Sequence, residues 1–391
     1  MSGTLILGSG WHPFLFRSEI KSLFGDFKIL HPRLILLDKA IEDKFLSRLS
    51  SAALVDDLIH FGGFSNETDF TRLSQEISNW SRENLPLGSF AVRSKKLGSG
   101  VKGISRRDLE KEVGAELYSD KNPVDLNNPQ YEIVIIVAGK VDGEVHWDSV
   151  ASNPCIIWGI RENKWTKPNF IGRQPMERPF FKPISLEPRL AKLLISLAHR
   201  EAINPKIMID PFCGTGGIAI EALLQGMDVY ASDLDPTMVY GAKKNLSWAD
   251  KHNSGIIKVE KCSVKNIAKL WAKKKNCIFA FDPPYGRNAW KSDDGLELFL
   301  AALAQALEID PGSTISTMLP AGAESLENDP EVDYIVMGRP WSEIENQINA
   351  IGWSVVVRSP VKVHKSLARM VVVCHPLHRN QITPARLITR A

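Results

Sequence analysis

Apolar runs of strand length alternate with amphipathic helical patterns through the second half of the chain. After a helix predicted over residues 186–199, seven such runs follow. The predicted strands are residues 206–209, 228–232, 256–259, 277–281, 313–318, 354–357 and 370–374. Helical patterns separate most of them, so this order predicts a doubly wound α/β sheet.

The first 150 residues carry a different pattern. A short strand over 5–7, an apolar stretch over 28–37 and a helical pattern through Leu54 and Leu58 predict a small α+β unit. Two further helices and two further strands are predicted beyond Phe64. The helices contain Phe70, Leu73 and Ile77, and Leu109, Val113 and Leu117; the strands are residues 89–93 and 131–138.

Between these regions, residues 153–183 have spaced prolines, aromatic and basic residues and little periodicity, which predicts a linker. A chain of 391 residues is also too long for one ordinary core. We therefore expect four parts. They are residues 1–60, 61–150, a linker over 151–183, and the α/β domain over 184–380.

Composition excludes several classes of protein. The net charge of +3 is slight, so a site for a polyanion has to come from local clustering of charge. The five cysteines are scattered without a CxxC pair, which argues against a zinc ribbon or disulfide framework and fits a reducing compartment. No signal peptide is indicated and the apolar runs are too short to cross a bilayer. We expect a soluble cytoplasmic protein without a metal or a membrane partner.

One local excess of positive charge lies between Pro86 and Glu112, where seven Lys/Arg face three Asp/Glu. The basic residues bracket a glycine loop at the start of a predicted helix, where backbone N–H groups and cations converge on phosphates. They are Arg93, Lys95, Lys96, Lys102, Arg106 and Arg107. On charge alone, a phosphate-binding surface and an ordinary solvated face both remain open.

The first chemical motif is DPFCGTGG, residues 210–217, between an apolar strand and a helix. Glycines at such a turn let the backbone approach a ligand, and the helix offers free N–H donors. The next strand ends in Asp233, an acceptor for ribose hydroxyls, so the pair indicates an adenosine-containing cofactor. The turn lacks the G-x-G-x-x-G spacing of dinucleotide sites and the G-K-[ST] of phosphate cradles. Cys213 lies inside the motif, and we expect it to be structural.

The second motif is DPPYG, residues 282–286, directly after the strand 277–281. At that end of the strand it faces the same crevice as the glycine turn. Asp282 and the carbonyl of Pro283 can accept hydrogen bonds from an exocyclic NH₂ group, while Tyr285 stacks on the base. Such a grip aims the amine at an electrophilic methyl group, so catalysis is largely positioning. Trp290 is a further candidate to stack on a flipped base, with plain packing as the alternative.

Together, the two motifs resemble the amino-methyltransferase branch of the class I S-adenosylmethionine-dependent enzymes. More narrowly, the chain resembles the archaeal THUMP-containing tRNA (guanine-10-N2) methyltransferases, relatives of a eukaryotic enzyme that needs a small partner protein. Further segments carry the likeness. They are residues 178–185 (RPFFKPIS), 233–236 (DLDP), 241–245 (GAKKN) and 364–369 (HKSLAR). The resemblance implies that the first of these covers the methionine end of the cofactor.

The resemblance also implies roles and an architecture. A Rossmann-like class I methyltransferase domain follows a ferredoxin-like domain and a THUMP module that grips tRNA, on the likeness of residues 89–93 and 105–107. The implied catalytic residues are Asp282, Pro283 and Tyr285. The implied contacts to S-adenosylmethionine are Asp210, Phe212, Gly214, Gly216, Asp233, Leu234, Ser263 and Asp282. The implied contacts to RNA are Arg93, Lys95, Lys96, Arg106 and Arg107.

Ser263 departs from the family pattern, which has an aspartate for the adenine amine of the cofactor. A serine accepts that bond without charge, and Asn266 is a possible substitute. DPPY alone also does not separate guanine N2 from adenine N6. We therefore keep two alternatives: an amino-methyltransferase for another base or site, and a non-catalytic RNA-binding protein with a degenerate cofactor pocket.

Overall fold

The computed structural model describes residues 3–141, 150–183, 185–250, 255–284, 294–326, 332–364 and 367–377. The chain divides into two compact units. The first unit comprises residues 1–17, 26–49 and 54–168, and the second comprises residues 18–25, 50–53 and 169–391. Helix α1 (Pro13–Phe24) therefore contributes its second half to the unit that holds both chemical motifs.

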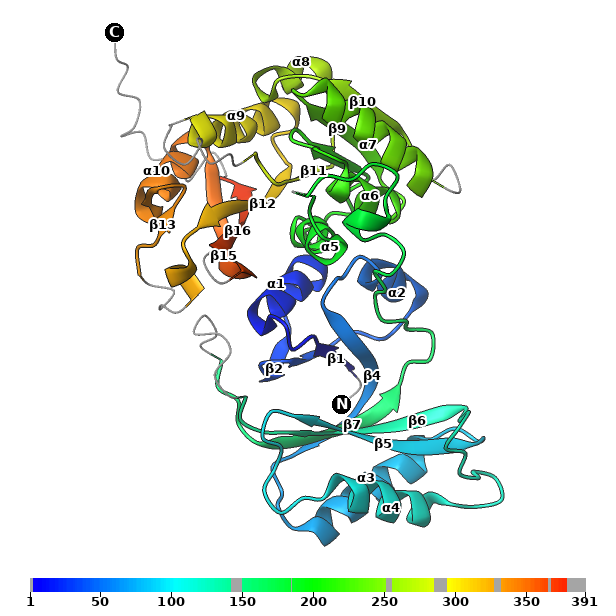
Figure 1. Cartoon of the computed structure of the whole chain (residues 1–391). Coiled ribbons are helices and arrows are strands. Elements are labelled where there is room, and N and C mark those ends of the chain that lie inside the picture. The colour runs from blue at the N-terminus through cyan, green and yellow to red at the C-terminus, as the bar shows by residue number, and fades with distance from the viewer. Residues whose placement is uncertain are drawn as a thin grey trace. The chain divides into compact units, whose positions relative to one another are not determined.

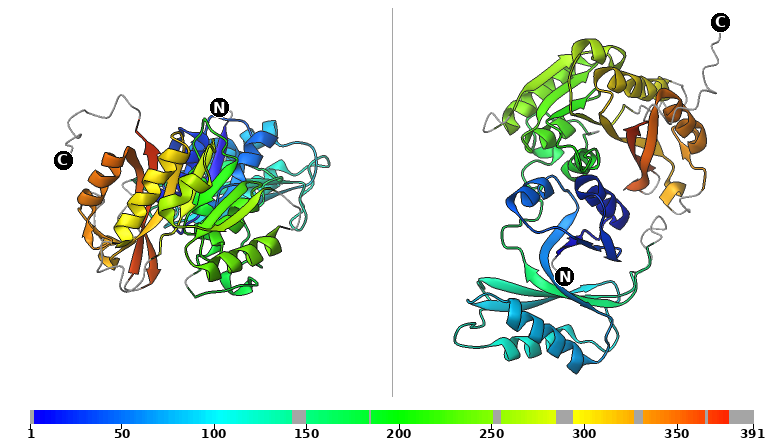
Figure 2. Two further views of the ribbon diagram at one scale, coloured as in Figure 1. Left: turned by 90° about the horizontal axis from the view of Figure 1, so that it is seen from above. Right: turned by 180° about the vertical axis from the view of Figure 1, so that it is seen from behind.

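The first unit is built on a seven-stranded sheet in the order β2-β3-β1-β4-β7-β6-β5. Its strands are β1 (Thr4–Gly8), β2 (Lys28–His31), β3 (Leu34–Leu37), β4 (Val55–Ser65), β5 (Phe90–Leu97), β6 (Tyr131–Ala138) and β7 (Cys155–Arg161). Helices α3 (Phe70–Asn84) and α4 (Arg106–Leu117) cover one face of β5, β6 and β7 (Figures 1 and 2). Helix α2 (Asp43–Leu49) precedes β4. Only β5 and β6 pair in parallel among the described strands of this sheet.

Two predictions for this region were wrong in detail, and the sequence assigned the apolar stretch 28–37 to no particular element. The helical spacing of Leu54 and Leu58 is coincidental, because Val55–Ser65 forms β4 and Leu58 pairs with Ile6 of β1. The stretch 28–37 is two strands joined by a tight turn. The predicted linker contains β7, a buried strand between β4 and β6. A single short strand gives little periodicity, and its sheet partners decide its structure.

The second unit is built on a mixed sheet in which β10, β9, β8, β11 and β12 are parallel neighbours. Strand β16 extends it antiparallel to β12, and β15 pairs with β16. These strands are β8 (Ile207–Asp210), β9 (Asp228–Asp233), β10 (Ile257–Lys261), β11 (Cys277–Phe281), β12 (Thr314–Ala321), β15 (Trp353–His364) and β16 (Leu367–Pro376). The short β13 (Ile335–Val336) and β14 (Arg339–Pro340) continue from β12. The predicted α/β sheet is confirmed, with longer strands at its antiparallel end.

Helices connect and cover these strands. They are α5 (Pro188–Leu197), α6 (Gly217–Leu223), α7 (Pro236–Ala249), α8 (Ile267–Leu270), α9 (Asp294–Ile309) and α10 (Trp341–Ile351), with short turns η1 (Pro175–Glu177), η2 (Val264–Asn266) and η3 (Ala323–Leu326). Helix α5 packs on β11 and β12, whereas α6 and α7 pack on β9. Because β8, β9 and β11 are parallel, their carboxyl ends meet at one edge, where Asp210, Asp233 and Asp282 stand.

The second half of α1 is anchored within the second unit. The side chain of Glu19 is buried and its Oε1 accepts hydrogen bonds from the backbone N of Ala53 and from the hydroxyl of Ser196 on α5. A buried carboxylate needs such donors, since without them its desolvation is costly. The second unit therefore includes two short pieces from the start of the chain.

Candidate active site

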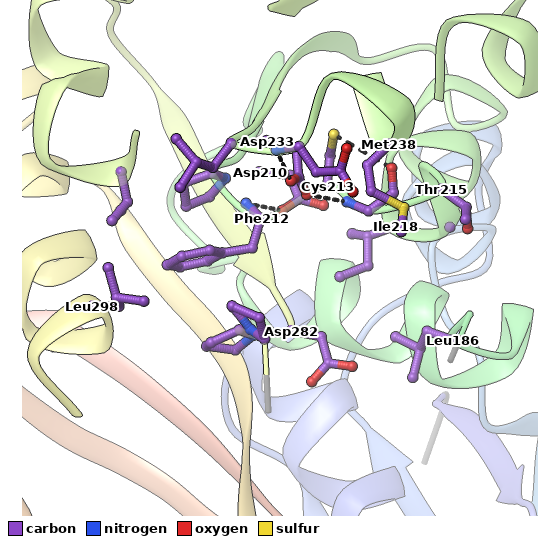
Figure 3. Close-up of a pocket in the computed structure, with 18 of the residues that line it drawn as sticks. Leu186, Asp210, Phe212, Cys213, Thr215, Ile218, Asp233, Met238, Asp282 and Leu298 are labelled. Carbon is purple, nitrogen blue, oxygen red and sulfur yellow. Dashed lines mark hydrogen bonds between the residues drawn. The ribbon is translucent and has the colours of Figure 1, made fainter. Parts of the chain in front are cut away.

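A cavity of about 390 Å³ opens at the carboxyl ends of β8, β9 and β11. Its size suits a ligand of nucleoside dimensions. Figure 3 shows Asp210, Asp233 and Asp282 around it, together with the ring of Phe212. The other described lining residues are Ser185, Leu186, Pro211, Cys213, Gly214, Thr215, Gly217, Ile218, Leu234, Asp235, Met238, Cys262, Ser263, Val264, Pro283, Pro284, Leu298 and Arg369.

The glycine turn needs glycine for its backbone conformation. Gly214 has φ +49° and Gly216, the N-cap of α6, has φ +84°, which side chains disfavour. A Cβ on Gly214 would meet no atom within 4 Å, whereas one on Gly216 would contact Ala242 of α7 at 3.4 Å. Gly214 therefore presents open backbone to a ligand, and Gly216 permits close packing of α6 on α7.

Asp233 ties the turn to the end of β9. Its Oδ2 accepts from the N–H of Gly214 at 2.9 Å and its Oδ1 accepts from the N–H of Asp235 at 2.9 Å. Each carboxylate oxygen has two lone pairs, so both can still accept from ribose hydroxyls. The same side chain thus shapes the glycine turn and offers the acceptors that a nucleoside needs.

Asp210 is buried beneath the turn, and its Oδ1 accepts from the N–H of Phe212 at 3.0 Å. Burial raises the pKa of Asp210 well above its usual value; the hydrogen bond from Phe212 opposes this, and the negative charges of Asp233 and Asp282 add to it. Burial likewise raises the pKa of the Cys213 thiol, which fits a structural role.

Asp282 follows β11 and forms an ion pair with Arg369 of β16, whose Nη1 donates to Oδ2. The other oxygen, Oδ1, is buried and has no hydrogen-bond partner among the described residues. Burial raises the pKa of Asp282, while the charge and hydrogen bond of Arg369 lower it. An unpartnered buried acceptor beside a cavity fits a ligand that brings a donor.

Apolar side chains line the rest of the cavity. The ring of Phe212 lies 5.6 Å from the ring of Phe281, and Ile218, Met238 and Leu298 add further apolar surface. A planar, largely apolar ring system fits such a lining, with its polar groups directed to the carboxylates. The residues present therefore fit an adenosine-containing cofactor.

The segment before α5 is fastened to the glycine turn. The hydroxyls of Ser185 and Thr215 lie 2.9 Å apart, and Arg178 donates to the carbonyl of Leu186 at 3.2 Å. The side chain of Asn245 bonds the backbone N and O of Phe180 and the carbonyl of Thr215. These contacts join the segment, the turn and α7 beside the cavity.

Comparisons with known proteins agree with this geometry. A family model described as "RMKL-like, methyltransferase domain" matches residues 175–329. The tRNA (guanine(10)-N2)-dimethyltransferase of Methanothermobacter thermautotrophicus is 27% identical over 381 residues, 94% of this chain and 98% of that protein. Its counterpart from Pyrococcus abyssi is 29% identical over 265 residues, 67% of this chain and 72% of that protein. The chain is therefore similar, over most of its length, to archaeal tRNA (guanine(10)-N2)-dimethyltransferases, and it contains a methyltransferase domain over residues 175–329.

Among solved structures, TrmN from Thermus thermophilus is similar over 96% of this chain and 100% of its own, at 18% identity and a TM-score of 0.46. The predicted family is confirmed, and the protein is an S-adenosylmethionine-dependent methyltransferase. No group of three or more potential metal ligands occurs among the described residues. Within the same residues, no helix is long and apolar enough to span a membrane.

The predicted cofactor residues of this methyltransferase come together at the cavity, with one exception. Gly216 is the N-cap of α6 and does not line it. Ser263 lines it and caps η2, where its hydroxyl accepts from the N–H of Lys265 at 3.4 Å. Leu234 lines it while 67% exposed. Tyr285 and Trp290 lie outside the described residues.

The predicted RNA-binding residues of the methyltransferase fall into two groups. Lys95 donates to Asp57 at 2.6 Å, and Arg93 pairs with Glu132 at 3.4 Å. Lys96, Arg106 and Arg107 are exposed and form no ion pair within the described part of the chain; Arg106 donates only to the carbonyl of Ser94. Charge clustering in the sequence did not separate these groups, because the acidic partners of Arg93 and Lys95 come from other strands.

Sequence reasoning missed the place of Arg369 in the site. Its signal was a charged residue directly before the apolar run 370–374, which is unusual inside a buried strand. The roles of Thr215 and Met238 at the cavity also went unassigned, because isolated small or apolar residues carry no chemical signature.

Proposed function

We propose that this protein transfers methyl groups from S-adenosylmethionine to N2 of the guanosine at position 10 in tRNA. The observation that carries the proposal is the meeting of both motifs at one cavity, with a buried acceptor on Asp282 left without a partner among the described residues. The names of the relatives support the substrate, since three of them are tRNA (guanine(10)-N2)-dimethyltransferases.

In this proposal, Asp210, Phe212, Gly214, Asp233, Leu234 and Ser263 hold the cofactor, which supplies an electrophilic methyl group when bound. Asp282 accepts a hydrogen bond from the exocyclic amine, and the carbonyl of Pro283 accepts a second one. Two fixed acceptors orient the nitrogen lone pair, and the carboxylate stabilises the positive charge that develops on the amine. Tyr285 stacks on the guanine.

The target base must leave its stack to reach the cavity, at a cost of ~a few kcal/mol. One base contributes little affinity for a whole tRNA, so we assign the grip on phosphates to the first unit. Lys96, Arg106 and Arg107 are the best candidates, because Arg93 and Lys95 already pair with carboxylates. The identification of residues 1–60 as ferredoxin-like and 61–150 as THUMP belongs to the same proposal.

Unmodified tRNA transcripts with guanosine or adenosine at position 10, incubated with protein and S-adenosylmethionine, test the function. We expect nucleoside mass spectrometry to detect N2-methylguanosine, N2,N2-dimethylguanosine or both, from the guanosine transcript alone. If the product is N6-methyladenosine, the substrate base is adenine and the assignment to guanine is wrong. Repeating the reaction with a cell extract added tests whether a small partner protein is required.

A second substrate has a specific observation in its favour. The bovine U6 snRNA (guanine-N(2))-methyltransferase THUMPD2 is 25% identical over 289 residues, which is 72% of this chain and 49% of that protein. The same guanine chemistry on another RNA is therefore the alternative. A U6 snRNA transcript in the same assay separates the two, and higher kcat/KM on U6 than on tRNA would favour it.

A further inference from the structure

We propose that Arg369 is a positioning residue for methyl transfer, which holds Asp282 by one oxygen so that the other oxygen accepts from the target amine. The inference rests on the proposed function, because it assigns the acceptor amine to Asp282. It goes beyond the motif, since Arg369 lies 87 residues away on another strand.

Strand register brings the two residues together. Asp282 directly follows β11, β11 is a parallel neighbour of β12, and Arg369 stands opposite Pro320 of β12 in the antiparallel strand β16. The side chains of Arg369 and Asp282 are 20% and 16% exposed, and both residues line the cavity. The pair is therefore supported by three hydrogen-bonded strands rather than by a loop.

The chemistry of the pair selects one state of Asp282. A guanidinium has donors only, so its partner oxygen has to act as an acceptor. A protonated Asp282 would present an O–H donor to an amine that also donates, and the grip would fail. The ion pair thus keeps both oxygens as acceptors, one for Arg369 and one for the substrate.

The charges around Asp282 oppose one another. Burial raises the pKa of Asp282, and Arg369 on β16 lowers it. Asp210 on β8 and Asp233 on β9 add negative charge at the same edge of the sheet. Removing Arg369 raises the pKa of Asp282, so the carboxylate is lost at a higher pH. Activity that needs the carboxylate falls as pH falls through this pKa, and the acidic limb of kcat moves upward in pH.

The experiment compares Arg369→Gln, Arg369→Lys, Asp282→Asn and the double variant in full-length protein with tRNA. Arg358→Gln is the matched control, because Arg358 lies on the adjacent strand β15, over the rings of Tyr334 and Trp341 and away from the cavity. We expect kcat of Arg369→Gln at pH 7 to fall ~100-fold and to recover partly at higher pH. Affinity for S-adenosylmethionine should stay within about threefold. Arg369→Lys keeps the positive charge but has an ammonium in place of the guanidinium, so its kcat should lie between those of wild type and Arg369→Gln.

The double variant separates positioning from simple loss of structure. If Arg369 acts through Asp282, Arg369→Gln should lower kcat no further in the Asp282→Asn background. Carboxyl-¹³C NMR of aspartate-labelled protein, with Asp282→Asn for assignment, should show Asp282 titrating at higher pH in Arg369→Gln. This readout needs no RNA.

Three outcomes overturn the inference. In Arg369→Gln, neither the acidic limb of kcat nor the titration of the Asp282 carboxyl moves in pH, or kcat and the affinity for S-adenosylmethionine fall by the same factor. In the double variant, the losses of kcat caused by the two single substitutions add up. Should Arg369→Gln fail to fold, the same comparisons are made with Arg369→Met, which also removes the positive charge, and wild-type kcat and titration in that variant overturn the inference. If wild-type protein methylates no guanosine, the proposed function has failed instead, and the NMR titration alone decides the Asp282–Arg369 coupling.

Discussion

Two groups of carboxylates, one in each unit, are treated very differently by the fold. On the sheet of the first unit, Asp57 accepts from Lys95 and bidentately from Arg161, and Glu132 pairs with Arg93 and Arg161. At the cavity of the second unit, Asp282 has one paired oxygen and one without a partner among the described residues. Asp57 and Glu132 form the complete group, in which each carboxylate is paired with basic side chains, as a structural network requires. Asp282 belongs to the incomplete group at the cavity, where a carboxylate oxygen unpaired among the described residues is retained because a bound ligand can supply its hydrogen-bond donor.

We expect the largest effect from a substitution in the incomplete group at the cavity. Asp282→Ala removes the acceptor of the target amine, and we expect kcat to fall by ~10²–10³ or more, the loss usual for one transition-state contact. Affinity for S-adenosylmethionine should stay within a few-fold, since other residues hold the cofactor. Single-turnover kinetics and calorimetry measure the two quantities. Unchanged turnover would remove Asp282 from the mechanism.

Asp57→Asn tests the complete group. The side chain of Asp57 is 6% exposed, whereas those of Lys95 and Arg161 are 35% and 26% exposed. Because its partners reach water, we expect a loss of ~1–3 kcal/mol of unfolding free energy, below the cost of a fully buried broken pair. Urea unfolding measures it, and kcat at saturating tRNA should stay unchanged. A kcat loss as large as that of Asp282→Ala would contradict the contrast.

Asp233→Ala removes both the tie on Gly214 and the acceptor for ribose. A hydrogen bond to a charged group contributes ~1.5–3 kcal/mol, so we expect S-adenosylmethionine to bind ~10–100-fold more weakly. Asp233→Asn, which retains one oxygen acceptor, should lose less. Isothermal titration calorimetry compares them, and equal affinity in all three proteins would exclude Asp233 from cofactor binding.

The basic residues of the first unit sharpen the comparison on the RNA side. Replacing the exposed Lys96, Arg106 and Arg107 with glutamine should weaken tRNA binding and reduce the slope of log K against log salt by about 2–3. Replacing the paired Arg93 and Lys95 should change the slope less, since carboxylates already neutralise them. Filter binding at several salt concentrations tests this. The reverse ranking would mean that tRNA displaces the carboxylates.

The smallest effect concerns Ser263. Aspartate also caps helices, so Ser263→Asp should keep the cap on η2 while adding a charged acceptor. We expect a several-fold gain in S-adenosylmethionine affinity, within ~1 kcal/mol, by calorimetry. Weaker binding would show that Ser263 does not occupy the adenine position.

The sequence predicted the second unit well because its strands are continuous apolar runs and its motifs sit at strand ends. Cys277–Phe281 and the acid after it are an example. It failed for β4 and β7, whose structure depends on pairing with each other and with β1 and β6. The sequence did not predict the Arg369–Asp282 pair for the same reason, since only strand register brings together residues that are so far apart in the chain.

The docking of Glu19 has a consequence for the order in which the protein can fold during synthesis. The second unit needs residues 18–25 and 50–53, which leave the ribosome early, and Ser196 on α5, which leaves it about 180 residues after Glu19. The hydrogen bond between Ser196 and the buried carboxylate of Glu19 can therefore form only after all residues of the first unit have been synthesised. This late, non-local contact belongs to the slow class of folding events. For the same reason, a catalytic fragment begun at Phe180 would lack part of its own fold, and both early segments should be retained when that unit is studied alone.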